Sequence, residues 1–82
     1  MDKAKYLILG NDEYPNAPYI FPAFLYHRQV ARALGSQFGS VISAGAITES
    51  GGVRHGSDSL GIEYNAKQEE FDRMMISRYA PE

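Results

Sequence analysis

The densest set of chemically capable side chains in this chain lies between Arg54 and Gly61, where the sequence reads Arg-His-Gly-Ser-Asp-Ser-Leu-Gly. Glycines allow the backbone to approach a ligand closely, and successive N–H groups in such a loop can bind an anion. The serine hydroxyls and the Arg-His pair add donors suited to phosphate. A solvated loop is the alternative interpretation. The residues predicted to bind a phosphate-bearing ligand in this segment are Arg54, His55, Gly56, Ser57, Asp58 and Ser59.

His27 is the second candidate group. Residues 23–34 predict a helix that begins after Phe21-Pro22, because proline is tolerated in a first turn, and that ends at Gly35. His27 falls on the apolar side of this helix, where a histidine is either a core residue or a general acid or base. If the 54–61 loop folds over the helix, His27 could donate to a phosphate oxygen or attack phosphorus.

Aromatic and basic side chains extend this candidate site. Tyrosines could stack on the bases of a nucleotide or serve as packing anchors. Arg28 and Arg32 are four residues apart on the outer face of the predicted helix, where arginines form a binding patch or a solvated surface. The further ligand-binding candidates are Tyr14, Tyr19, Tyr26 and Arg28.

Composition excludes several classes of protein. A net charge of −2, from eight basic and ten acidic side chains, argues against binding to duplex nucleic acid. The chain has no cysteine, and its two histidines lack a metal-ligand spacing, so we expect no metal and no cofactor. No apolar run approaches the length of a membrane span, and the first residues lack the apolar core of a signal peptide. These features predict a cytoplasmic protein without a membrane partner.

Short elements must position these groups. Residues 6–9 form an apolar run typical of a buried strand, and residues 11–18 have the proline and asparagine content of a loop. Residues 41–47 and 53–55 predict two strands joined by a turn that contains Gly51-Gly52. Small residues in the first of these strands leave space for close packing above it.

The last predicted helix begins after Asn65 and runs to about Arg78, with Asn65 and Gln68 spaced as a capping box. Its apolar side chains should face the core or a subunit contact, and these are Phe71, Met74 and Met75. The order is then β-α-β-β-α, an α+β fold with a mainly antiparallel sheet and two packed helices in one domain over residues 1–82. A core this small favours a homo-oligomer.

Three ordered blocks of the sequence resemble a family of small, mostly uncharacterised bacteriophage and prophage proteins. The first block runs from Phe21-Pro22 through Leu25-Tyr26-His27 to Gly35, and the others are residues 41–46 and 55–62. The chain departs from the family pattern at Ala46, where a phenylalanine is expected. The resemblance implies a compact phage protein, a class that includes sponges for the cyclic nucleotide signals of bacterial immunity.

The order of motifs is also similar, more loosely, to the janus-type phosphohistidine phosphatases. There a strand like residues 5–9 precedes a Tyr-His pair, which Tyr26-His27 mirrors, and a Gly-x-Ser-x-x-x-Gly-like loop binds phosphate before a helix, as residues 57–61 do in spacing. This resemblance implies that His27 is the general acid or base and that the loop hydroxyls and amides hold phosphate. The chain is shorter than those enzymes and lacks much of their middle.

Taken together, the sequence predicts a phage-encoded homo-oligomer that binds and sequesters a phosphate-bearing small molecule, above all a cyclic nucleotide immune signal, without turning it over. One alternative is a phosphohistidine-phosphatase-like hydrolase that uses His27. Another is a phage interaction module that binds no small ligand.

Overall fold

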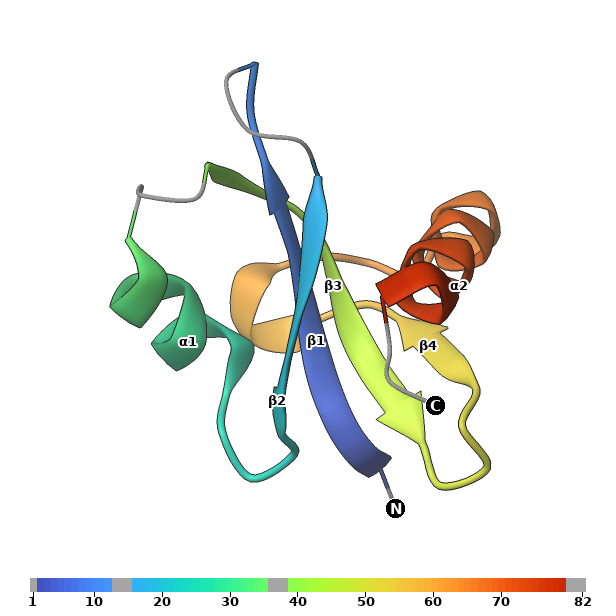
Figure 1. Ribbon diagram of the computed structural model, residues 1–82. Coiled ribbons are helices and arrows are strands. Elements are labelled where there is room, and N and C mark those ends of the chain that lie inside the picture. Colours follow the sequence, from blue (N-terminus) through green and yellow to red (C-terminus); the bar gives the residue numbers. More distant parts are fainter. Residues whose placement is uncertain (1, 13–15, 36–38, 80–82) are drawn as a thin grey trace.

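Strand β1 (Asp2–Gly10) contains the apolar run and lies inside a four-stranded sheet, in a computed structural model that describes residues 2–12, 16–35 and 39–79 (Figure 1). Its neighbours are β2 (Ala17–Pro22) and β3 (Ser40–Thr48), and β4 (Val53–His55) completes the antiparallel order β2-β1-β3-β4. The four apolar side chains at positions 6–9 are almost fully buried. The predicted buried strand is confirmed and is longer than the apolar run.

The two faces of the sheet are covered by different helices. Side chains alternate across a strand, so Leu7 and Leu9 of β1 pack toward α1 (His27–Leu34), whereas Tyr6 and Ile8 pack toward α2 (Ala66–Tyr79). Figure 1 shows α1 and α2 on opposite sides of the sheet. The result is a three-layer arrangement with β1 at its centre.

Strand β2 corrects two predictions. Residues 17 and 18, expected in a loop, begin a strand, and Phe21-Pro22, expected to start a helix, end it. Prolines fit here because β2 is an edge strand, where Pro18 and Pro22 need not donate to a neighbour. The helix therefore begins at His27, after a turn, and not at Ala23.

The hairpin between β3 and β4 agrees with the prediction. β3 covers the expected residues 41–47 with one more at each end, and β4 has the expected bounds. In the turn, Gly51 N–H donates to Thr48 O at 2.9 Å, and Gly51 has a φ of 89°, a conformation that favours glycine. A short 3₁₀ turn, η1 (Asp58–Leu60), then leads toward α2.

Helix α2 buries a different face from the one predicted. Phe71 and Met74 are exposed, Met75 is half-buried in the core, and the fully covered positions are Asp72 and Ile76. Asp72 and Ile76 are one turn apart, so they define the stripe that meets the sheet. A subunit contact through Phe71 and Met74 stays a prediction.

The start of α2 has half of the predicted capping box. The Gln68 N–H donates to Asn65 Oδ1 at 3.0 Å, but the Gln68 side chain donates to Asp72 instead of returning to Asn65. The α+β class is confirmed, with the order β-β-α-β-β-α. Within the described ranges, neither helix combines the length and apolarity that crossing a membrane requires.

Candidate functional site

A cavity of about 870 Å³ lies between the start of α1, the hairpin strands and the loop that follows β4. Most of the predicted site residues line it, namely Tyr26, His27, Arg54, His55, Gly56, Ser57, Asp58 and Ser59. The condition that the sequence analysis left open is met, because the polar loop lies against the start of α1, which carries His27. The two histidines share this cavity.

His27 is buried and held in one orientation. Its Nε2 lies 2.6 Å from the carbonyl oxygen of Gly45, and the edge of its ring meets Phe21 at a centroid distance of 5.5 Å. Because a carbonyl only accepts, Nε2 carries the proton and Nδ1 has the lone pair in the neutral ring. Burial lowers the pKa of His27, and the positive charge of Lys5 lowers this pKa further. His27 is therefore a neutral base near pH 7.

Lys5 is the main site residue that the sequence analysis missed. Its Nζ donates to Leu25 O at 2.8 Å and lies 5.2 Å from the centroid of the Tyr26 ring, and the residue lines the cavity. An ammonium group has three donors, so the bond to Leu25 leaves two for a ligand. The alternation of side chains along β1 could have revealed this position. Lys5 and Leu7 are two residues apart, so both side chains point to the face of the sheet that α1 covers.

The loop after β4 is closed by a pair of backbone hydrogen bonds. Ser57 N–H donates to Ile62 O, and Ile62 N–H donates to Ser57 O, both at 2.9 Å. Gly56 and Gly61 flank the loop with φ values of 125° and 70°. Both glycines therefore serve the backbone conformation of the loop.

Only part of the predicted amide cradle is available to a ligand. The N–H groups of Leu60 and Gly61 donate within the loop. The N–H groups of Asp58 and Ser59 have no acceptor among residues 2–12, 16–35 and 39–79. The Ser59 hydroxyl lies 3.3 Å from that of Ser57, so the two hydroxyls form a connected polar edge beside the free amides.

Arg54 and His55 make hydrogen bonds within the fold that the sequence analysis did not predict. Arg54 Nη2 donates to Asp2 Oδ2 at 2.6 Å in an exposed ion pair. His55 Nδ1 accepts the N–H of Asn65 at 3.0 Å, and the N–H of His55 donates to Glu69 at 3.1 Å. His55 therefore connects the cavity wall to the start of α2.

Two predicted residues do not line the cavity, and a third is not among the described residues. Tyr19 packs against the buried cluster on the α1 face, as a packing anchor would. Arg28 is exposed and does not line the cavity, and Tyr14 is outside the described residues. The structure adds cavity residues that the prediction lacked: Asp2, Lys5, Glu63 and Tyr64.

Within the described part of the chain, no three side chains of His, Asp or Glu converge as metal ligands do. Comparison with known protein families, with curated proteins and with solved structures finds no match for this chain. The resemblances to phage proteins and to janus-type phosphatases therefore stay predictions. The function has to be argued from the geometry of the cavity.

Proposed function

We propose that this protein binds a phosphate-bearing small molecule in the cavity and sequesters it intact, with a cyclic nucleotide signal as the leading ligand. The observation that carries the proposal is the meeting of the Lys5 ammonium, the buried His27 ring and the loop around Ser59 in one cavity of about 870 Å³. Small-molecule sites in proteins have volumes of roughly 300 to 1,000 Å³. A nucleotide fits that range.

The donors of the cavity suit one phosphate group. The Lys5 ammonium and the N–H groups of Asp58 and Ser59, which have no acceptor among the described residues, can all donate charge-assisted hydrogen bonds to a phosphate. Bonds of this kind are shorter and stronger than those between neutral partners. Phosphate binding needs no contribution from Arg54, which is paired with Asp2.

The remaining wall suits the organic part of a nucleotide. Tyr26 and Tyr64 line the cavity with 63% and 61% of their surface exposed, so their rings are accessible for stacking on a base. Asp58 and Glu63 are carboxylates that accept hydrogen bonds from the amino groups of bases. These acids also oppose the entry of a second phosphate into the cavity itself.

A titration series tests binding and retention. Calorimetry with cyclic di- and trinucleotides, nucleoside monophosphates and inorganic phosphate should show saturable binding, and chromatography after denaturation should recover the ligand intact. Lys5→Gln should weaken binding about tenfold or more, because a hydrogen bond to a charged group contributes about 1.5 to 3 kcal/mol. Lys3→Gln is the matched control, because Lys3 lies on the same strand but does not line the cavity. Absence of binding to every probe would contradict the proposal and favour an interaction module.

The second candidate function is hydrolysis of a phosphorylated substrate, for example phosphohistidine. The fixed tautomer of His27 favours it, because a neutral base with a free Nδ1 lone pair can accept a proton. If the wild type releases free phosphate from such a substrate and His27→Ala does not, the protein is a hydrolase and the sequestration proposal is wrong. Unchanged turnover in His27→Ala would exclude His27 as the catalytic group.

The proposal includes a cytoplasmic homo-oligomer encoded by a phage. Exposed Phe71 and Met74 on α2 are the apolar side chains available for a subunit contact on that face. Light scattering gives the mass in solution. A strict monomer would remove the version of the proposal in which subunits share a ligand, while leaving the cavity itself intact.

A further inference from the structure

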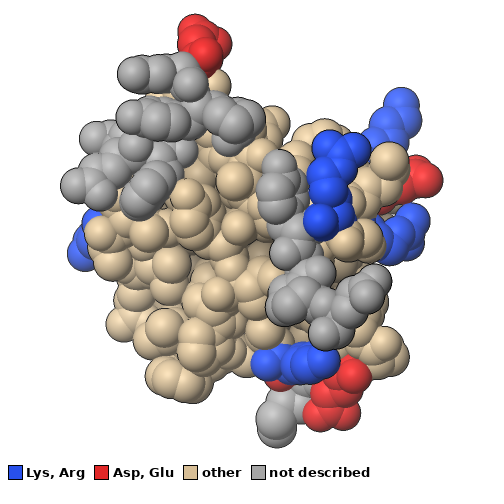
Figure 2. Space-filling view, viewed as in Figure 1, with Lys and Arg blue, Asp and Glu red and all other residues tan. Residues whose placement is uncertain are grey.

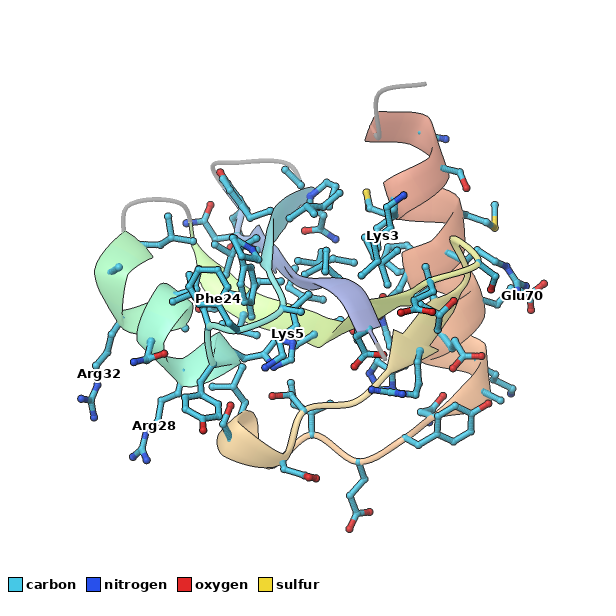
Figure 3. All side chains as sticks on the ribbon, turned by 90° about the horizontal axis from the view of Figure 1, so that it is seen from below. Lys3, Lys5, Phe24, Arg28, Arg32 and Glu70 are labelled. Atoms are coloured by element: carbon cyan, nitrogen blue, oxygen red, sulfur yellow. The ribbon has the colours of Figure 1, made fainter. Side chains whose placement is uncertain are left out.

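The surface beside the cavity combines exposed aromatic rings with arginines. Phe24 is 82% exposed and Tyr26 is 63% exposed, and both lie in the turn before α1. Arg28 and Arg32 follow on the outer face of α1. Figure 3 shows both arginines pointing away from the sheet on the α1 side. We call these four side chains the α1 surface: Phe24, Tyr26, Arg28 and Arg32.

Hydrogen bonds hold the turn that presents the two rings. Leu25 N–H donates to Pro22 O at 3.1 Å, and Lys5 Nζ donates to Leu25 O at 2.8 Å. On the helix side, Tyr26 N–H donates to Gln29 Oε1 at 3.0 Å. The backbone under the rings is therefore fixed before any ligand arrives, which lowers the entropy cost of binding.

The charge of the α1 surface differs from that of the whole chain. The sequence of α1 contains no acidic residue, and within the described ranges neither Arg28 nor Arg32 makes an ion pair. Helix α2 instead mixes Lys67 and Arg73 with several carboxylates. Figure 2 shows Lys and Arg side chains over α2 with an acidic side chain among them. The two helices thus differ in that α1 carries positive charge without neighbouring carboxylates in its own sequence, whereas α2 carries both signs.

We infer that the ligand is an oligonucleotide, of which one phosphate enters the cavity while the next nucleotide unit lies on the α1 surface. This inference rests on the proposed function. Tyr26 belongs to both places, because it lines the cavity and follows Phe24 by two residues in the same turn. A base can stack on the open Phe24 ring, and the following phosphate can meet Arg32 or Arg28, which are about 6 Å apart along the helix. An acidic peptide would pair with the arginines but would gain little from a flat exposed ring.

The test compares ligands of different length. Calorimetry is run with adenosine monophosphate, with 5′-phosphorylated linear di- and trinucleotides, with cyclic dinucleotides and with a phosphorylated acidic peptide. The trinucleotide should bind about tenfold tighter than the monophosphate, because one additional stacked base contributes a factor of about 5 to 150. Phe24→Ala and Arg32→Gln should each remove most of the gain and leave monophosphate binding unchanged, because neither residue lines the cavity.

The control is the single variant Arg73→Gln on α2, which removes the same charge as Arg32→Gln but from the opposite face of the sheet. It should retain the full gain. Equal affinity for the monophosphate and the trinucleotide would overturn the inference while leaving the proposed function in place. A gain shown by the peptide alone, or lost equally in the α2 control, would also overturn it. Failure of every probe to bind would instead contradict the proposed function.

Discussion

The two faces of the sheet treat polar groups in opposite ways. On the α2 face, Asp72 is completely buried and its carboxylate is used up by partners within the fold. On the α1 face, Lys5, His27 and the loop around Ser59 keep donors or lone pairs that no described residue uses. A polar group that is satisfied internally is structural, and one with spare capacity beside a cavity is available for a ligand.

The α2 face shows how complete this internal use is. Asp72 Oδ2 accepts hydrogen bonds from Tyr6 Oη and Ser43 Oγ, both at 2.6 Å, and its Oδ1 accepts one from Gln68 at 2.9 Å. Burial, together with the neighbouring carboxylate of Asp72, raises the pKa of Tyr6 well above its usual value. Tyr6 therefore stays protonated and remains a donor at any physiological pH.

Gly45 connects the two faces. On the α2 side, the space where a side chain would lie is filled by the ring of Tyr6. On the α1 side, the carbonyl oxygen of Gly45 fixes the tautomer of His27. The packing of one face thereby sets the position of the base in the other.

The largest expected effect tests whether the network of hydrogen bonds around Asp72 stabilises the fold. Asp72→Ala should reduce the free energy of unfolding by about 3 kcal/mol, because it leaves the buried hydroxyls of Tyr6 and Ser43 without an acceptor. Urea denaturation measures the change. Asp58→Ala, on the exposed η1 turn, is the matched control and should leave stability nearly unchanged. A loss below about 1 kcal/mol for Asp72→Ala would mean that the network relaxes easily.

The next prediction tests the connection through Gly45. In Gly45→Ala, the added methyl would overlap the carbonyl oxygen of Arg54 and lie 2.5 Å from Tyr6 Oη, so β3 or Tyr6 must move. Overpacking of this kind costs about 1 to 3 kcal/mol. The His27 ring resonances should shift in NMR spectra as well. Gly52→Ala, whose methyl would meet only the flexible Thr48 side chain closely, should show neither effect.

A smaller effect is expected in the cavity loop. Gly61 has a φ of 70° and open space around its missing side chain, so Gly61→Ala should cost about 1 kcal/mol through backbone strain alone. Gly61→Asn should cost less, because asparagine tolerates this conformation. Thermal unfolding of the two variants gives the comparison, and equal losses would point to a cause other than strain.

The last prediction concerns the protonation of His27. Its pKa is lowered in the folded state, so the unfolded chain binds more protons between that pKa and about 6.5. Stability should therefore be fully present above about pH 6.5 and should fall as the pH drops through the folded pKa. Unfolding curves of the wild type and His27→Gln between pH 5 and 8 measure this, since the variant lacks the titrating group. A midpoint for His27 above 6.5 in an NMR titration would contradict the assignment.

Much of the fold follows from local patterns in the sequence. The apolar run in β1, the glycine turn after β3 and the side chain of Asn65 each act over a few residues, and each produced the expected element. Strand β2 was not predicted from the sequence, because prolines usually indicate that a segment is not a strand. Only the position of β2 at the edge of the sheet makes its prolines acceptable.

The candidate site likewise has features that the sequence predicts and features that only the tertiary structure decides. The sequence by itself determined that polar donors and glycines are concentrated in the 54–61 loop, because both are properties of neighbouring residues. The tertiary structure alone decided that Lys5 joins His27, that Arg54 is paired with Asp2 and that Asp72 is buried. These outcomes depend on contacts between residues far apart in the chain, and the strand period places Lys5 on a face of the sheet without identifying the partners on that face.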